Sequence, residues 1–377
     1  MIARVACGLM GMALLIVSGC TPISHSRVSP EAYWQNQQNW TNALTAVPAY
    51  PGYLEELNRQ QLSPGDRVKI TIAAGEHFNG LYEIDHDGTL RMPWITPTQV
   101  TGRTVEDVSK TLAAKLEDEG LFRRGLAYVT VQLHSWAPIS VRIEGAVFNP
   151  GRVDISARSA IDRSERQAVA SGEAGSGRRL SNAIAAAGGV RPDADIHRVT
   201  LIRNEVHFDI DLSGFLDGTT VIDPYLQAGD RLIIESSGYF SPALMRPLPI
   251  TLPGLKIYAS NLTLPASHNA GSALNEDAMS FPYGARFLQA AIKSNCVGGT
   301  QATSGGRHIV LISTDLITGK PVVIERSAGE LVRNSNDTGI NPWLMPGDTV
   351  SCYDSGVTNL RDVAKTITEL VLPFSLF

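Results

Sequence analysis

The sequence predicts an α+β protein built from several domains. Its 377 residues leave room for two or three domains of roughly 150 residues each. A tight-turn motif followed by a short strand-like run occurs three times along the chain. Between the turns, segments with the alternating pattern of strands are interspersed with a few segments that have helical spacing. With 43% hydrophobic and 18% charged residues, such domains can bury substantial cores.

The first predicted element is a signal peptide over residues 1–19. Arg4 is its only charge, and the apolar run that follows is too short for a lasting transmembrane helix. The run ends in Val17-Ser-Gly-Cys20, which resembles the lipobox of bacterial lipoproteins. We therefore expect Cys20 to be the acylated first residue of the mature chain, with cleavage nearby by an ordinary signal peptidase as the alternative. Thr21 stands where an Asp usually signals inner-membrane retention, which favours the outer membrane.

The repeated motif follows the pattern Leu-x-Pro/Ala-Gly-Asp-x-Val/Leu. It occurs at residues 62–68, 226–232 and 344–350. Pro or Ala followed by Gly-Asp makes a tight turn, because Gly supplies a positive φ and Asp can bond its own backbone. We interpret Asp66, Asp230 and Asp348 as structural residues that lead the chain into a strand.

An N-terminal segment over residues 20–61 precedes a predicted compact α+β unit over residues 62–137. The unit has strands around the turn Asp87-Gly88, a helix that Thr104 opens, and a further strand over residues 128–133. The residues with the spacing of one buried helical face are Val105, Val108, Leu112 and Leu116.

A second predicted unit covers residues 138–240. It opens with two short strands around the turn Asn149-Pro-Gly151, and a short helix from Leu180 is stopped by Gly188-Gly189. A polar insertion with five arginines, residues 156–179, lies between them. Its glycines lack the Lys-Ser/Thr of a phosphate loop, so we interpret it as a solvated loop.

These motifs carry a resemblance to known families. Residues 62–133 resemble the polysaccharide export domain, and residues 138–240 resemble a soluble-ligand-binding β-grasp (SLBB) domain. The motifs of the first are Pro64-Gly-Asp66, Asp87-Gly88, Pro93 and Gly102-Arg-Thr-Val-Glu106, and those of the second are Gly145 to Gly151, Ala185 to Gly189 and Ala228-Gly-Asp230.

Residues 248–354 resemble a second, weaker SLBB-like repeat. Phe287 to Ile292 corresponds to the helix, Cys296-Val-Gly-Gly299 to the double glycine, and Pro346-Gly-Asp348 to the closing turn. The opening of this repeat lacks the Asn-Pro-Gly turn, so the sequence does not define its first strand.

Together with the lipobox, this plan is similar to that of the Wza-type outer-membrane polysaccharide export lipoproteins. The resemblance implies an export domain, two β-grasp domains and a C-terminal amphipathic helix. It also implies a homo-oligomeric ring of about eight subunits with closed symmetry. A capsular or extracellular polysaccharide would pass through the ring, and an inner-membrane co-polymerase of the tyrosine-kinase type would meet its periplasmic end. No cofactor is implied.

The C-terminal segment, residues 356–377, has the pattern of an amphipathic helix starting near Leu360, with Asn359 as the N-cap. At 100° per residue, the apolar side chains fall within an arc of about 120°. The resemblance implies that this arc faces lipid and that the polar face lines a wet lumen. The apolar set is Leu360, Val363, Ala364, Ile367, Leu370, Val371 and Phe374, and the predicted lumen-facing set is Asp362, Lys365 and Glu369.

The alternative for this segment is a helix packed on its own domain. The 19 residues from Asn359 to the end span at most about 28 Å at 1.5 Å each, and Pro373 should bend or end the helix. Because the bacterial outer membrane is thin, such a helix is just long enough to span it.

Apart from Cys20, the chain that follows the leader contains two cysteines, Cys296 and Cys352. In an oxidising periplasm they are candidates for a disulfide, with two separately buried thiols as the alternative. The net charge of −5 gives no reason to expect nucleic-acid binding. No HExxH, paired histidine or Gly-x-Ser-x-Gly motif occurs, so we do not expect an enzyme. The alternative to a conduit is a monomeric periplasmic lipoprotein that binds a soluble glycan.

Overall fold

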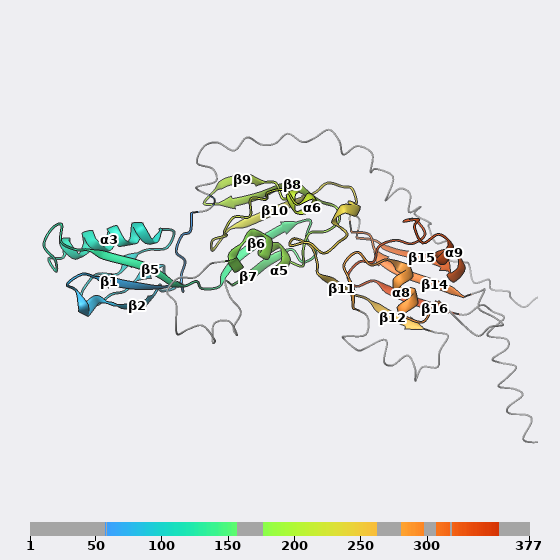
Figure 1. Cartoon of the computed structure of the whole chain (residues 1–377), viewed down its shortest axis with the longest axis horizontal. Coiled ribbons are helices and arrows are strands. Elements are labelled where there is room, and N and C mark those ends of the chain that lie inside the picture. Colours follow the sequence, from blue (N-terminus) through green and yellow to red (C-terminus); the bar gives the residue numbers. More distant parts are fainter. Residues whose placement is uncertain are drawn as a thin grey trace, which may run out of the picture.

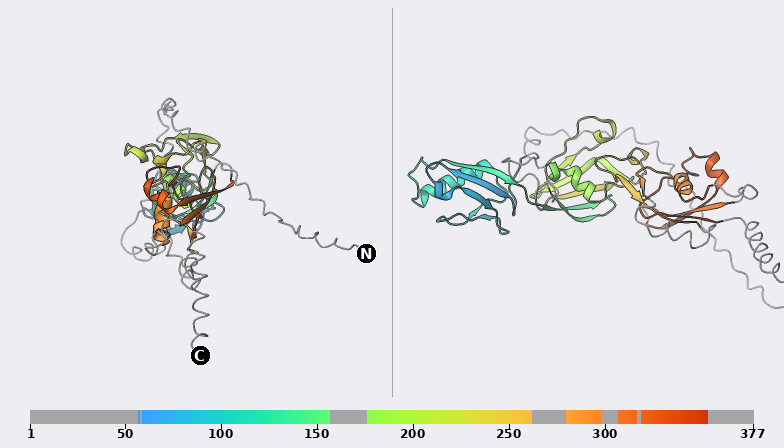
Figure 2. Two further views of the ribbon diagram at one scale, coloured as in Figure 1. Left: turned by 90° about the vertical axis from the view of Figure 1, so that its right-hand side faces the viewer. Right: turned by 60° about the horizontal axis from the view of Figure 1, so that its bottom comes forward.

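The computed structural model forms three α+β units that follow one another in a row (Figure 1). The views in Figure 2 agree that the molecule is elongated. The structure describes residues 57, 59–156, 176–261, 280–297, 307–316 and 319–353. The expected mixed α and β content is confirmed, and the several sheets are compatible with the expected division into domains.

The first unit, at the blue end of Figure 1, is a three-stranded antiparallel sheet in the order β2-β1-β5, with helix α3 packed against β5. Its elements are β1 (Arg67–Ile72), η2 (Glu76–Phe78), β2 (Gly80–Glu83), β3 (Thr89–Leu90), β4 (Thr98–Gln99), α3 (Val105–Asp118) and β5 (Val129–Ser135). Thr104 caps α3 as the sequence predicts, because its side chain accepts a hydrogen bond from the backbone N–H of Asp107. Val108, Leu112 and Leu116 lie buried in the core, and Val105 packs at its margin.

The second unit is a five-stranded sheet in the order β7-β6-β10-β8-β9. Strands β6 and β10 are parallel neighbours, and all other pairs are antiparallel. Its elements are β6 (Ile139–Gly145), β7 (Gly151–Ile155), η3 (Ser176–Arg178), α5 (Leu180–Ala186), β8 (Ala194–Arg203), β9 (Val206–Ile210), α6 (Gly214–Asp217) and β10 (Arg231–Ser236). Helix α5 packs on β6 and β7 and closes the core.

The third unit repeats this plan in reduced form. Its main sheet has the order β12-β16-β14-β15, with β12 and β16 parallel, and β11 pairs with β13 beside it. Its elements, with the turn η4 before them, are η4 (Pro242–Leu244), β11 (Gly254–Lys256), β12 (Tyr258–Asn261), β13 (Ser280–Pro282), α8 (Phe287–Lys293), β14 (His308–Thr314), β15 (Pro321–Ser327), α9 (Ala328–Arg333) and β16 (Thr349–Tyr353). The first strand that the sequence leaves undefined is thus divided into β11 and β12.

The two helices α5 and α8 end in the same way. Gly188 takes a φ of 78° after α5, and Asn295 takes a φ of 54° after α8. The next backbone N–H, of Gly189 or Cys296, bonds the carbonyl five residues back in each case. The sequence-based match of the double glycine to Gly298-Gly299 is therefore wrong, because Asn295 already supplies the left-handed residue that ends the helix.

Candidate functional site

The three Gly-Asp turns have one geometry. In each, the buried aspartate accepts a hydrogen bond from the backbone N–H three residues earlier, and the preceding glycine has a positive φ. The bonds are Ser63 to Asp66 at 2.7 Å, Gln227 to Asp230 at 2.8 Å and Met345 to Asp348 at 2.8 Å. The structural role predicted for the three aspartates agrees with this arrangement.

The first turn joins the first unit to the second. The Asp66 carboxylate lies 2.6 Å from the guanidinium of Arg178 and also accepts a bond from the Ala137 N–H at 2.7 Å. Arg178 donates to the Ala137 carbonyl and lies over the ring of Trp136, 4.4 Å from its centroid. Burial raises the pKa of Asp66, and the Arg178 guanidinium counteracts this effect. One buried ion pair thus fixes the exit of β5 against the start of α5.

The segment before the first turn also crosses this junction. Leu57 is fully buried in the core of the second unit, and its carbonyl accepts a bond from Arg203 at 3.4 Å. Gln227 donates to the Arg59 carbonyl at 3.3 Å. The chain therefore touches the second unit before it enters the first, which the predicted boundary at residue 62 does not anticipate.

The second and third turns differ in the partner of the aspartate. Arg203 forms a two-pronged pair with Asp230, at 3.1 and 2.7 Å. The strand register places Ser313 of the third unit at the position of Arg203, because Ile202 and Ile312 pair with the equivalent residues of β10 and β16. Ser313 bonds Asp348, whose pKa is raised by burial to about 7.

A second repeated feature holds the start of each helix. Arg179 lies over Tyr225 at 4.9 Å, and Arg286 lies over Trp343 at 4.3 Å. The residue after each arginine donates its backbone N–H to a proline carbonyl of the same segment. Asp223 and Asn341 accept the next N–H of the helix, at 2.9 and 2.8 Å.

This clamp was not anticipated from the sequence, although a signal for it exists. The residues just before the second and third repeated turns are Asp223-Pro-Tyr225 and Asn341-Pro-Trp343. A longer comparison of the repeated motif would have found this shared carboxylate or amide, proline and aromatic residue.

Tight backbone and aromatic contacts hold the segment that leads from the second unit to the third. The Val190 N–H donates to the Ile250 carbonyl at 2.8 Å, and a Cβ on Gly189 would approach the backbone of Thr251 to 2.8 Å. Phe240 stacks on Trp343, with ring centroids 5.4 Å apart. Only glycine fits at position 189, so this joint is specified by the double glycine that ends α5.

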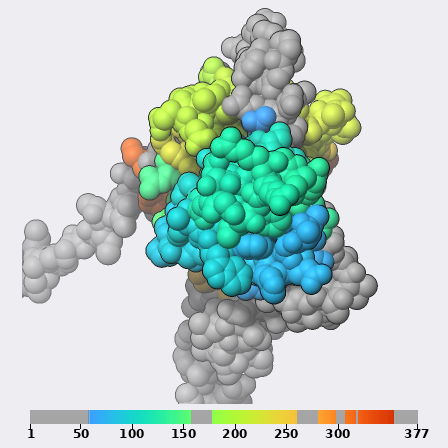
Figure 3. All heavy atoms as spheres, turned by 90° about the vertical axis from the view of Figure 1, so that its left-hand side faces the viewer, coloured from blue at the N-terminus to red at the C-terminus, as the bar shows by residue number. Residues whose placement is uncertain are grey.

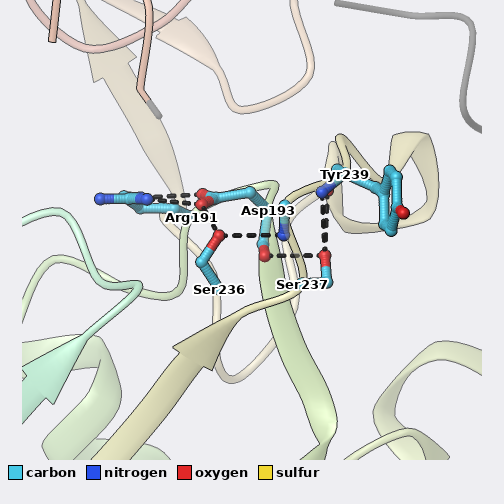
Figure 4. A network of polar contacts seen from close by, with 6 residues as sticks. Arg191, Asp193, Ser236, Ser237 and Tyr239 are labelled. Carbon is cyan, nitrogen blue, oxygen red and sulfur yellow. Dashed lines mark hydrogen bonds and ion pairs between the residues drawn. The ribbon is translucent and has the colours of Figure 1, made fainter. Parts of the chain in front are cut away.

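A polar network fixes the exit from β10 (Figure 4). Arg191 pairs with Asp193 at 2.8 Å, and Ser236 donates to the same carboxylate at 2.5 Å. The Ser237 N–H bonds the Asp193 carbonyl at 2.7 Å, and Ser237 Oγ accepts the N–H of Tyr239 at 3.2 Å. The chain therefore leaves the second unit along a defined path.

The predicted site residues fall into two groups. Cys20, the apolar set from Leu360 to Phe374 and the lumen-facing set of Asp362, Lys365 and Glu369 lie outside the described residues. Cys296 and Cys352 are both fully buried and are joined in the structure, with Cα atoms 5.7 Å apart. Whether this bond forms in the cell stays a prediction.

Among the residues that the structure describes, no three His, Cys, Asp or Glu side chains are grouped so that they could hold a metal ion. Within the same ranges, no helix is both long and apolar enough to cross a membrane. The repeated turns and clamps hold strands and helix starts in place within the units, and the first turn also joins two units.

Comparison with known proteins bears on the first unit. Residues 55–134 match the model of a family described as polysaccharide biosynthesis/export protein. The match confirms the resemblance to an export domain, and it begins before the predicted boundary, so that it includes Leu57. No curated protein matches the chain.

Proposed function

We propose, from the polysaccharide biosynthesis/export domain over residues 55–134, that this protein is one subunit of a ring through which a polysaccharide leaves the cell. The domain belongs to a family of export proteins and links the chain to polysaccharide transport. The proposal adds three points to this link, namely assembly into a ring, location in the outer membrane and the partner proteins.

The second and third units support this proposal as two β-grasp domains of the SLBB type. In each, the first and last strands lie side by side and parallel, and a helix packs on the sheet. The strand order, the aspartate turn and the clamp of the helix start occur in both units. This points to duplication of one module, which suits a subunit that extends away from an export domain.

The joints between the units also support a conduit. A ring wall must keep a fixed shape while a polymer passes, so its units should not hinge freely. The Asp66–Arg178 pair and the close approach at Gly189 hold the two junctions with buried contacts. Figure 3 views the molecule from the export-domain end, which in this proposal faces the inner-membrane co-polymerase of the tyrosine-kinase type.

In this proposal, both ends of the chain contact the outer membrane. Acylated Cys20 would anchor each subunit to outer-membrane lipid. The C-terminal helices would form the exit, with Ile367 on the lipid side and Glu369 on the lumen side. A ring of helices satisfies every backbone group within its own helix, which is the condition for any spanning element.

The proposal is tested by the mass of the full-length protein extracted in mild detergent. We expect a closed oligomer of about eight subunits, with closed rotational symmetry visible in electron micrographs. A monomer that binds soluble polysaccharide would contradict the conduit and favour the alternative, a glycan-binding lipoprotein. Loss of surface polymer in a deletion strain, with polymer retained in the periplasm, supports export in either case.

A further inference from the structure

The sheet of the third unit has one face packed on α8 and one open face. Ile309, Leu311, Val350 and Cys352 point into the core with α8. Their neighbours along each strand therefore point to the other side. The strand register sets Tyr258, Thr349, Ile312 and Val323 in one row across this side. Tyr258, Ile312 and Val323 keep 64%, 43% and 53% of their surface exposed.

The corresponding row of the second unit shows that the fold does not require this apolar surface. There the register sets Arg142, Arg231, Ile202 and His207 side by side. Arg231 also pairs with Glu144 at 3.0 Å on the same face. The equivalent faces of the two sheets thus differ in character. The face in the second unit is charged, and the face in the third unit has exposed aliphatic and aromatic side chains.

The chain leaves the third unit beside this open face. Strand β16 ends at Tyr353, whose ring stacks on His308 at 5.5 Å and whose hydroxyl donates to Glu325 at 2.5 Å. Both partners lie on the open face, because His308 alternates with the buried residues of β14 and Glu325 follows Ile324, which packs half-buried against the core. The predicted amphipathic helix starts near Leu360, so only a short linker separates it from Tyr353.

We propose that the C-terminal helix lies on this open face whenever no membrane is available. The inference rests on the proposed function, because it concerns the helix that would later span the membrane. An apolar arc in water needs a cover, and a short tether gives the nearest apolar surface a high effective concentration.

The dimensions fit this arrangement. From Tyr353 back to Thr349 the strand covers about 13 Å, at roughly 3.3 Å per residue. A helix running back over the sheet covers the same distance in about nine residues. Ile367, Leu370 and Val371 would therefore reach the row that contains Ile312 and Val323. On meeting lipid, the same arc would exchange the sheet for acyl chains.

The test is photo-crosslinking in the mature-length chain, residues 20–377 with Cys20→Ser so that it carries neither leader nor acyl groups, kept in buffer without lipid or detergent. A benzophenone amino acid at position 323 should give an intramolecular product that maps to residues 367–374. The same group at position 207, the equivalent place on the charged sheet, should give no such product. A product with residues 262–279, a dimer-sized product, or no product at 323 would overturn the proposal.

A second experiment tests whether the C-terminal helix packs on the open face without using a crosslinker. Val323→Asp should make trypsin cleavage after Arg361 and Lys365 at least several-fold faster in the lipid-free protein, and His207→Asp should leave it unchanged. Equal rates for wild type and Val323→Asp would contradict the docked helix.

Ring formation in detergent reports on the proposed function separately. A ring without the crosslink overturns only this inference, and a crosslink without any ring overturns only the conduit.

Discussion

Arg203 and Ser313 occupy the same position in two sheets of one plan, and each faces the buried aspartate of its own Gly-Asp turn. Arg203 gives Asp230 a guanidinium partner at 2.7 Å. Ser313 gives Asp348 only a hydroxyl. The turn at Asp230 therefore contains an ion pair, and the turn at Asp348 contains a hydrogen bond from an uncharged hydroxyl. The two aspartates should respond differently to substitution.

Asp230→Asn should strongly destabilise the second unit. The amide can still accept the Gln227 N–H, but Arg203 would stay buried without an anion, which costs roughly 3–5 kcal/mol. Hydrogen exchange of peptides from β8 and β10 measures the effect. Asp348→Asn is the matched control, because it leaves no cation unpaired, and at pH 8, where ionisation of the buried Asp348 already lowers the stability of the wild type, it should not destabilise the third unit. Equal losses in both variants would contradict the difference between the turns.

The stability of the third unit should fall as the pH rises from about 4 to 7. Burial raises the pKa of Asp348 from the ordinary 3.8 to about 7 in the folded chain. In this window the unfolded chain has already released the proton that the folded chain retains, so rising pH favours unfolding. Above pH 7 the effect is complete, at a few kcal/mol on the scale of about 1.4 kcal/mol per pKa unit. Hydrogen exchange of β14 and β16 at several pH values should show this slope in wild type and not in Asp348→Asn.

Much of the fold was predictable because local signals were strong. The N-cap Thr104 and the buried spacing of Val108, Leu112 and Leu116 define α3, and the structure has this helix with this face. The Gly-Asp turns were predictable as structural because glycine and aspartate each have a physical reason to be there.

The rest depended on contacts between residues far apart in the sequence. Arg178 was placed in a solvated insertion, yet it is buried against Asp66, which lies in another unit. Charge pairs at such separations leave no periodic signal. Asn295 replaced the glycine that the double-glycine pattern required, because asparagine also tolerates a positive φ. These two positions show why the joints were harder to predict than the units.

Cys20→Ser should prevent acylation and move the protein out of the outer-membrane fraction. In the proposed lipobox, Cys20 is the residue that the peptidase and the acyl donor would both use, so the variant should accumulate as uncleaved precursor. Membrane fractionation with mobility on denaturing gels measures this, and Cys7→Ser in the leader serves as the control. Recovery of the Cys20 variant at wild-type level and mobility in outer membranes would remove the lipoprotein proposal.

Cys296 and Cys352 should be oxidised in protein taken from the cell envelope. The two residues are 56 positions apart, and a loop of this size contributes on the order of 3–4 kcal/mol in the chain-entropy estimate. Thiol labelling of the denatured mature protein, in which Cys20 is acylated, should find no reactive thiol before reduction and two after it. Two reactive thiols without reduction would show that both are separately buried.

Ile367→Arg should abolish membrane insertion of the C-terminal helix while Glu369→Gln preserves it. Ile367 lies near the middle of the apolar arc, where an arginine costs roughly 2.5–3.5 kcal/mol per subunit on insertion scales. Repeated around a ring, this cost should prevent the exit from forming. In the predicted helix Glu369 falls on the polar face, so its neutral variant should change only the charge of the proposed lumen. The measurement is surface accessibility of a tag placed after Phe377 in intact cells. We expect the tag to be reachable in wild type and Glu369→Gln and hidden in Ile367→Arg. A wild-type tag that is never reachable would show that the helix stays in the periplasm, and the conduit would then have no exit.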